Sequence, residues 1–148
     1  MSHKGIRLLI EDTARSLGDD IQFTYGRDSD FNVMNDKRYP FIQLDLLNSA
    51  ASFSVNNVSN YSKGWNVFLL FHQLDKEASD QDDYKIILDD MDHLLDRFVQ
   101  QINKHDDIII QGINQQPFIK ATADTLTGWT LSFQLIINDN WDYCANDC

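Results

Sequence analysis

Residues 65–74 read Trp-Asn-Val-Phe-Leu-Leu-Phe-His-Gln-Leu, and this is the most apolar stretch of the 148-residue chain. Its apolar residues do not alternate cleanly with polar ones, which is typical of a strand that is covered on both faces. We therefore predict that residues 65–74 form the central strand of a sheet. His72 lies within this strand, and we interpret it as a hydrogen-bonded core or interface histidine in preference to a catalytic one.

A long amphipathic helix is predicted after this strand, over residues 84–104. Residues 79–83 supply a cap and acidic residues for its first turn, and Lys104 and His105 mark its end. A solvated face explains the aspartates of this helix better than a metal site, because carboxylates on one helix do not converge on an ion without further ligands. The apolar residues at helical spacing are Tyr84, Ile87, Leu88, Met91, Leu94, Leu95, Phe98 and Ile102, and the aspartates are Asp89, Asp90, Asp92 and Asp96.

The remaining pattern adds one helix and several strands. Residues 3–18 have the spacing of an amphipathic helix. We expect the last two strands to form an antiparallel hairpin around a turn at 124–128. The sequence thus predicts a single α+β domain over residues 1–137, with a mostly antiparallel sheet packed by an N-terminal helix and one long central helix. Beside the central strand, the predicted strands cover residues 21–25, 41–47, 51–55, 108–112, 117–124 and 129–137.

The chain is acidic, with 23 acidic against 12 basic residues and a formal net charge of -11. This charge repels phosphate groups and anionic lipids, and no basic patch is visible, which disfavours sequence-specific nucleic-acid binding and binding to a membrane surface. No apolar run approaches the roughly 20 residues of a membrane span, and no signal peptide is recognisable. We expect synthesis in a cytoplasm, with Cys144 and Cys148 as free thiols.

No catalytic or cofactor-binding motif is recognisable. The sequence contains no P-loop, no G-x-G-x-x-G, no H-E-x-x-H and no G-x-S-x-G, and its two cysteines do not have zinc-binding spacing. The glycines stand singly at the expected ends of elements, as turn glycines do. We therefore expect a protein that works without catalysis, metal or cofactor.

Large apolar residues lie in or beside two predicted loops and in the C-terminal tail. The loops cover residues 26–38 and 56–64, and the tail covers residues 138–148. Such residues either cover the domain's own core or contact a neighbouring subunit. The candidate interface residues are Phe31, Val33, Met34, Tyr39, Tyr61, Trp141 and Tyr143.

The order of these elements resembles the tail-terminator and tail-completion proteins of tailed phages. The likeness lies in the strand entry 38–42 (Arg-Tyr-Pro-Phe-Ile), the strand 65–74, the helix 84–104 and the segment 124–137. The Asx-rich, arginine-poor composition also resembles that of phages of Bacteroidetes hosts, including the crAss-like ones. The resemblance implies a homo-oligomeric ring of six- or twelve-fold symmetry at the neck or tail of the virion. Such a ring joins head-side connector proteins to the tail or terminates the tail, and DNA passes through it without specific binding.

Three function hypotheses therefore stand. The first is a structural ring subunit of the virion. The second is a small acidic binding or adaptor module, such as an inhibitor that mimics DNA through acids of the long helix, with Asp82, Asp89, Asp92 and Asp96 as its best feature. The third is an enzyme whose site carries no known motif, for which we would expect a concave pocket with convergent polar groups.

Overall fold

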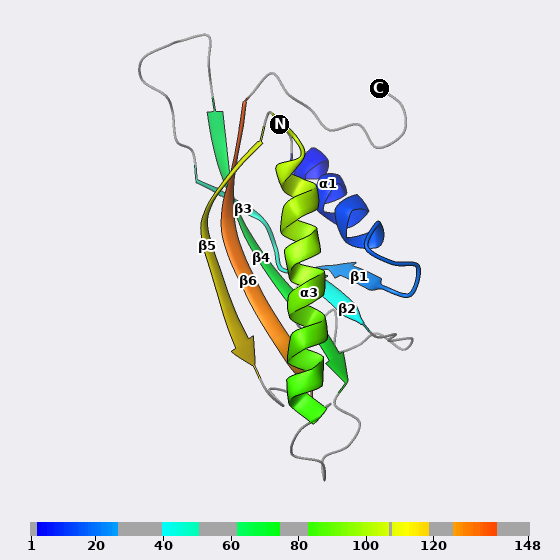
Figure 1. Ribbon diagram of the computed structural model, residues 1–148. Helices are drawn as coiled ribbons and strands as arrows, with labels where there is room; N and C mark the ends of the chain where they lie inside the picture. Colours follow the sequence, from blue (N-terminus) through cyan, green and yellow to red (C-terminus); the bar gives the residue numbers. More distant parts are fainter. Residues whose placement is uncertain are drawn as a thin grey trace.

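The computed structural model describes residues 3–26, 40–50, 62–74, 83–106, 108–118 and 126–138. Within these residues the chain forms two helices and one sheet of six strands (Figure 1). The predicted α+β class is confirmed. The helices are α1 (His3–Arg15) and α3 (Asp83–Asn103), and the strands are β1 (Gln22–Tyr25), β2 (Phe41–Leu44), β3 (Asn48–Ala50), β4 (Ser62–Leu74), β5 (Ile108–Phe118) and β6 (Leu126–Asn138).

The sheet is mixed, with antiparallel pairs in the majority, in agreement with the sequence prediction. Its strand order is β1-β2-β4-β6-β5, and β3 pairs with β4 beside this row. Among the described strands, β1 and β2 run parallel, and the other pairs are antiparallel. Residues 65–74 lie in β4, which pairs with β2, β3 and β6. The predicted central strand is therefore confirmed.

Both helices lie on the same side of the sheet (Figure 1). α3 packs along β4, β5 and β6, whereas α1 contacts α3 and β1. The apolar stripes of the two helices and alternate residues of the strands form one core, and burial of this apolar surface is the main source of stability. At its centre the ring of Phe98 lies 5.6 Å from that of Phe71 and 6.5 Å from that of Phe133, measured between centroids.

Two side-chain hydrogen bonds join α3 to the strands beneath it. The indole Nε1 of Trp129 in β6 donates to the carbonyl oxygen of Leu88 at 2.7 Å. Nε2 of Gln115 in β5 donates to the carboxylate of Asp92 at 2.6 Å. These bonds hold the helix along the sheet, so they also determine which face of the sheet the described helices cover.

The prediction that β4 is covered on both faces is wrong for part of the strand. Asn66 and Phe68 are exposed, and Leu70 is half-buried. The burial therefore has the period of two that is typical of a strand with one open face. The sequence hides this period because two residues on the open side, Phe68 and Leu70, are themselves apolar. The residues of β4 that alternate with them and are buried in the core are Trp65, Val67, Leu69 and Phe71.

β5 is one continuous strand where the sequence predicts two, at 108–112 and 117–124. Its register with β6 shifts between Gln111 and Asn114, and Gly112 has a φ of 65° at this point. Glycine adopts this backbone conformation at little cost, so the chain forms a β-bulge there and continues as a strand. Residues 119–125, which link β5 to β6, lie outside the described residues.

β6 begins at Leu126, inside the segment 124–128 that the sequence assigns to a turn. Gly128 therefore does not form a turn. It is required for the close packing of β6 against β4. A Cβ atom on Gly128 would overlap the carbonyl oxygen of Phe71 and would lie 2.7 Å from the Cα atom of His72. The missing side chain therefore lets β4 and β6 come close at this position.

Other boundaries also differ from the prediction. α1 ends at Arg15, and β2 ends at Leu44. The carboxylate of Asp45 accepts the backbone N–H of Leu46 at 2.8 Å, a local bond that competes with continuation of the strand. β3 then begins at Asn48, where a turn is predicted, and the predicted strand 51–55 lies outside the described residues.

Candidate functional site: the open face of the sheet

One face of the sheet has no described helix over it. Side chains on a strand alternate between the two faces, so the residues that alternate with the core residues of β4, β5 and β6 point to this opposite side. We call this surface the open face. It consists of Asn66, Phe68 and Leu70 of β4, Thr130, Ser132, Gln134 and Ile136 of β6, and Ile109, Gln111, Asn114 and Gln116 of β5.

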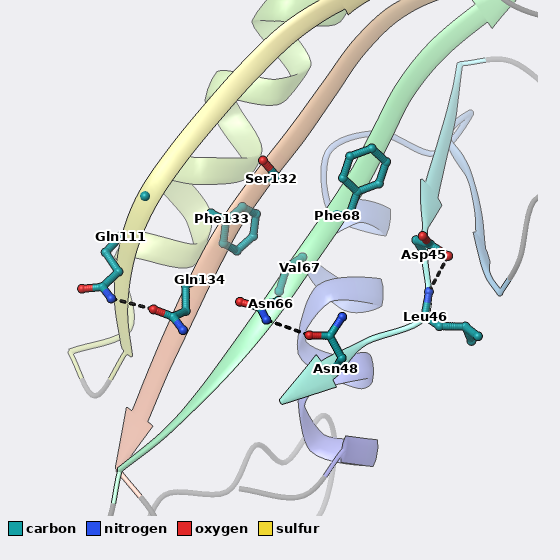
Figure 2. Close-up of a pocket in the computed structure, with 11 residues that line it drawn as sticks. Asp45, Leu46, Asn48, Asn66, Val67, Phe68, Gln111, Ser132, Phe133 and Gln134 are labelled. Atoms are coloured by element: carbon teal, nitrogen blue, oxygen red, sulfur yellow. Dashed lines mark hydrogen bonds between the residues drawn. The ribbon is translucent and has the colours of Figure 1, made fainter. Parts of the chain in front are cut away.

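A hollow of about 660 Å³ lies on the open face, across β3, β4, β6 and β5 (Figure 2). Val67 and Phe133 also border the hollow, but their side chains are part of the core on the other side of the sheet, so they contribute backbone atoms. The residues that line the hollow are Asp45, Leu46, Asn48, Asn66, Val67, Phe68, Gln111, Gly112, Ser132, Phe133 and Gln134.

Two pairs of amide side chains form the floor of the hollow (Figure 2). Nδ2 of Asn66 donates to Oδ1 of Asn48 at 2.7 Å and links β4 to β3. Nε2 of Gln111 donates to Oε1 of Gln134 at 2.6 Å and links β5 to β6. A primary amide has two N–H donors and a carbonyl acceptor, so each pair can form further hydrogen bonds toward the hollow. Of the described residues that line the hollow, Asp45 alone is charged.

Exposed apolar side chains lie beside these amides. Leu46 and Phe68, which are 45% and 41% exposed, line the hollow, and Ile109, which is 59% exposed, lies on the same open face. Scattered exposed apolar residues are common on soluble proteins, but exposed apolar residues that gather at one hollow are typical of interaction surfaces. The hollow therefore offers hydrogen bonding together with apolar contact, which is the composition of a protein-binding surface.

The other end of this side of the sheet is closed by aromatic rings. The ring of His72, which is 1% exposed, stacks on Phe41 with centroids 5.4 Å apart. The ring of Phe118 lies 6.3 Å from His72. In the ladders Gly128 is the partner of both His72 and Phe118, so these two rings meet over a residue that has no side chain. The buried position of His72 agrees with its interpretation as a core histidine.

The predicted interface residues lie outside the described residues and stay predictions. Phe68 and Ile109 of the open face were not among the candidates, although one signal was available. Ser132 and Gln134 alternate with apolar residues in β6, which already indicates an open face opposite the helices. The untested candidates are Phe31, Val33, Met34, Tyr39, Tyr61, Trp141 and Tyr143.

The aspartates of α3 differ in their exposure and in their hydrogen bonding. Asp89, Asp90 and Asp96 are exposed, as predicted for a solvated helix face. Asp92 is half-buried and accepts the hydrogen bond from Gln115, and Asp82 lies outside the described residues. Within the described part of the chain no three histidine, cysteine or acidic side chains gather as a metal-binding group. No helix there is long and apolar enough to cross a membrane.

The sequence matches no protein-family model, and no curated protein matches it.

Proposed function

We propose that this chain is a structural subunit of a closed homo-oligomeric ring at the neck or tail end of a tailed phage. In this proposal the chain is made in the cytoplasm of the bacterial host and becomes part of the virion. The ring joins head-side connector proteins to the tail or terminates the tail, and DNA passes through its channel without specific binding.

The observation that carries the proposal is the open face with its exposed apolar residues. Leaving apolar surface in water costs about 25 cal/mol for each Å². Leu46, Phe68 and Ile109 are all more than two-fifths exposed. Leu46 and Phe68 line the hollow, and Ile109 pairs with Ile136 on the open face. Burial of this surface against a neighbouring subunit would recover that free energy, which makes an assembled subunit the simplest explanation of the surface.

The charge of the chain supports a channel through which DNA moves. A ring of subunits that each carry a formal net charge of -11 is strongly negative. Such a ring repels the phosphate backbone, so a duplex meets no adhesive wall as it passes. The uncharged floor of the hollow also lets subunits approach one another with little local repulsion.

The purified chain tests this proposal directly. We expect native mass spectrometry over a series of protein concentrations to show one defined oligomer. We expect negative-stain electron microscopy to show closed rings with an opening that admits a DNA duplex. The gene should also lie beside portal, connector or tail genes. A chain that stays monomeric at all concentrations, or a gene among metabolic genes, would contradict the proposal.

A further inference from the structure

Exposed apolar residues occur on two opposite sides of the molecule. On the open face, Leu46 and Phe68 line the hollow and Ile109 lies beside it in β5. On the other side of the sheet lies α3 (Figure 1), which carries Ile86, a residue that is 60% exposed. A surface that pairs only with itself would explain the first group and leave Ile86 unexplained. Two unlike surfaces on one subunit are what a head-to-tail contact requires.

Ile86 is flanked by carboxylates on the same face of the helix. Residues three and four positions along a helix are neighbours, so Asp89 and Asp90 lie beside Ile86, and His93 and Asp96 continue the row. All five side chains are exposed. We call this surface the outer face of α3. It presents one apolar side chain beside a group of hydrogen-bond acceptors.

The hollow presents the complementary groups. Phe68 and Leu46 offer apolar contact to a side chain such as Ile86. The amides of Asn66 and Gln111 supply N–H donors, which form strong hydrogen bonds with ionised carboxylates. Among the described residues that line the hollow, Asp45 is the one whose charge repels a carboxylate.

The hollow is wide enough for a helix. It extends over β3, β4, β6 and β5, which are successive neighbours in the sheet. Neighbouring strands lie about 4.8 Å apart, so three spacings give roughly 14 Å. A helix with its side chains is about 10 Å across. A helix of another molecule thus fits on the open face of the sheet, while α1 and α3 of the same chain cover the opposite face.

We infer that the outer face of α3 in one copy of this chain docks into the hollow on the open face of the next copy. This inference rests on the proposed function, because it supplies the contact between ring subunits. Ile86 meets Phe68 and Leu46, and the carboxylates of Asp89 and Asp90 accept hydrogen bonds from the amides. The two surfaces are unlike, so each bound copy presents a free surface of each kind until the ring closes.

Two variants with matched controls test the contact. Phe68→Glu places a charge in the hollow, and Ile86→Glu places one on the outer face of α3. As controls, Gln116→Glu adds the same group to the open face outside the hollow, and Gln100→Glu adds it to α3 about 21 Å along the helix from Ile86. All four positions are exposed, so we expect folded proteins, to be checked by circular dichroism and thermal unfolding. Sedimentation and native mass spectrometry measure the assembly.

We expect each test variant alone to weaken assembly at least about tenfold, as the loss of a central interface residue does, and each control to assemble as the wild type does. A one-to-one mixture of the two test variants is the decisive sample. Phe68→Glu retains an intact outer face of α3, and Ile86→Glu retains an intact hollow. The mixture should therefore form a heterodimer with one copy of each and nothing larger.

Four results would overturn the inference. If Phe68→Glu breaks the assembly and Ile86→Glu does not, then α3 lies outside the contact, and a face-to-face pair or another partner covers the hollow. If both variants still form rings, the contact lies elsewhere while the proposed ring function stands. If both are monomeric and their mixture is too, the two surfaces do not bind each other. If the wild type is monomeric, the proposed function fails and the inference fails with it.

Discussion

Replacing Gly128 with alanine is expected to destabilise the fold far more than the same replacement at Gly112 or Gly18. The new Cβ atom would overlap the carbonyl oxygen of Phe71 and lie 2.7 Å from the Cα atom of His72. These are backbone atoms of the central strand, so they cannot rotate away as a side chain could. β4 and β6 would have to separate by roughly 1 Å or more to restore an ordinary contact, and such overpacking costs about 1–3 kcal/mol.

The separation would also weaken the ladder between the two strands. Each weakened backbone hydrogen bond costs about 1 kcal/mol. The sum predicts a loss of about 2–4 kcal/mol in the free energy of unfolding. Urea unfolding followed by circular dichroism measures this loss, and the melting temperature should fall by roughly 5–15 °C for a chain of this size. The measurements should be made at several protein concentrations, because subunit association adds to apparent stability.

The other two glycines provide the controls. A Cβ atom on Gly112 would have nothing within 4 Å, but its φ of 65° is unfavourable for alanine, so we expect a cost of about 1 kcal/mol. A Cβ atom on Gly18 would lie 3.4 Å from the flexible end of Ile21, an ordinary contact, so we expect a change within about 0.5 kcal/mol. The reasoning is refuted if Gly128→Ala costs less than Gly112→Ala or leaves stability unchanged.

Three further substitutions test the core and the bonds that join α3 to the sheet, each by urea unfolding. Phe98→Ala leaves a cavity beside Phe71 in the fully buried centre and should cost about 3–5 kcal/mol; a cost below about 1 kcal/mol would contradict this core. Trp129→Phe removes the bond to the Leu88 carbonyl and should cost about 1 kcal/mol, with no change if the indole bond is absent in solution. Gln115→Ala removes the bond to the half-buried Asp92 carboxylate and should also cost about 1 kcal/mol, whereas Gln111→Ala at an exposed amide pair should cost less.

The elements with strong periodic patterns were predictable from the sequence. α3 carries its buried residues at helical spacing, and Met91, Leu95 and Ile102 are buried as that spacing requires. β6 alternates, and Leu131 and Phe133 face the core. In these elements each position follows a local rule of periodicity, and the rule needs no knowledge of the neighbouring strand.

Features that depend on partner strands were not predictable in the same way. The bulge that keeps β5 continuous needs the register of β6, and the parallel pairing of β1 with β2 needs the path of the chain between them. Gly128 looks like a turn glycine until β4 is placed beside it. The open face was missed for a similar reason, since Phe68 reads as a core residue unless its cross-strand partner Ser132 identifies the solvent side.

The salt dependence of association separates a self-assembling ring from an acidic module that binds a basic partner. Two copies with a formal net charge of -11 each repel one another, and salt screens this repulsion over a Debye length of about 8 Å at physiological ionic strength. The amide groups of the hollow carry no net charge, so salt screens their bonds to the carboxylates of α3 much less. Self-association should therefore strengthen, measured by sedimentation, when salt rises from about 50 to 300 mM. A basic partner held by the acids of α3 would dissociate over the same range, because its attraction is the term that salt screens. An oligomer that dissociates when salt is added would contradict the head-to-tail contact and favour the acidic module.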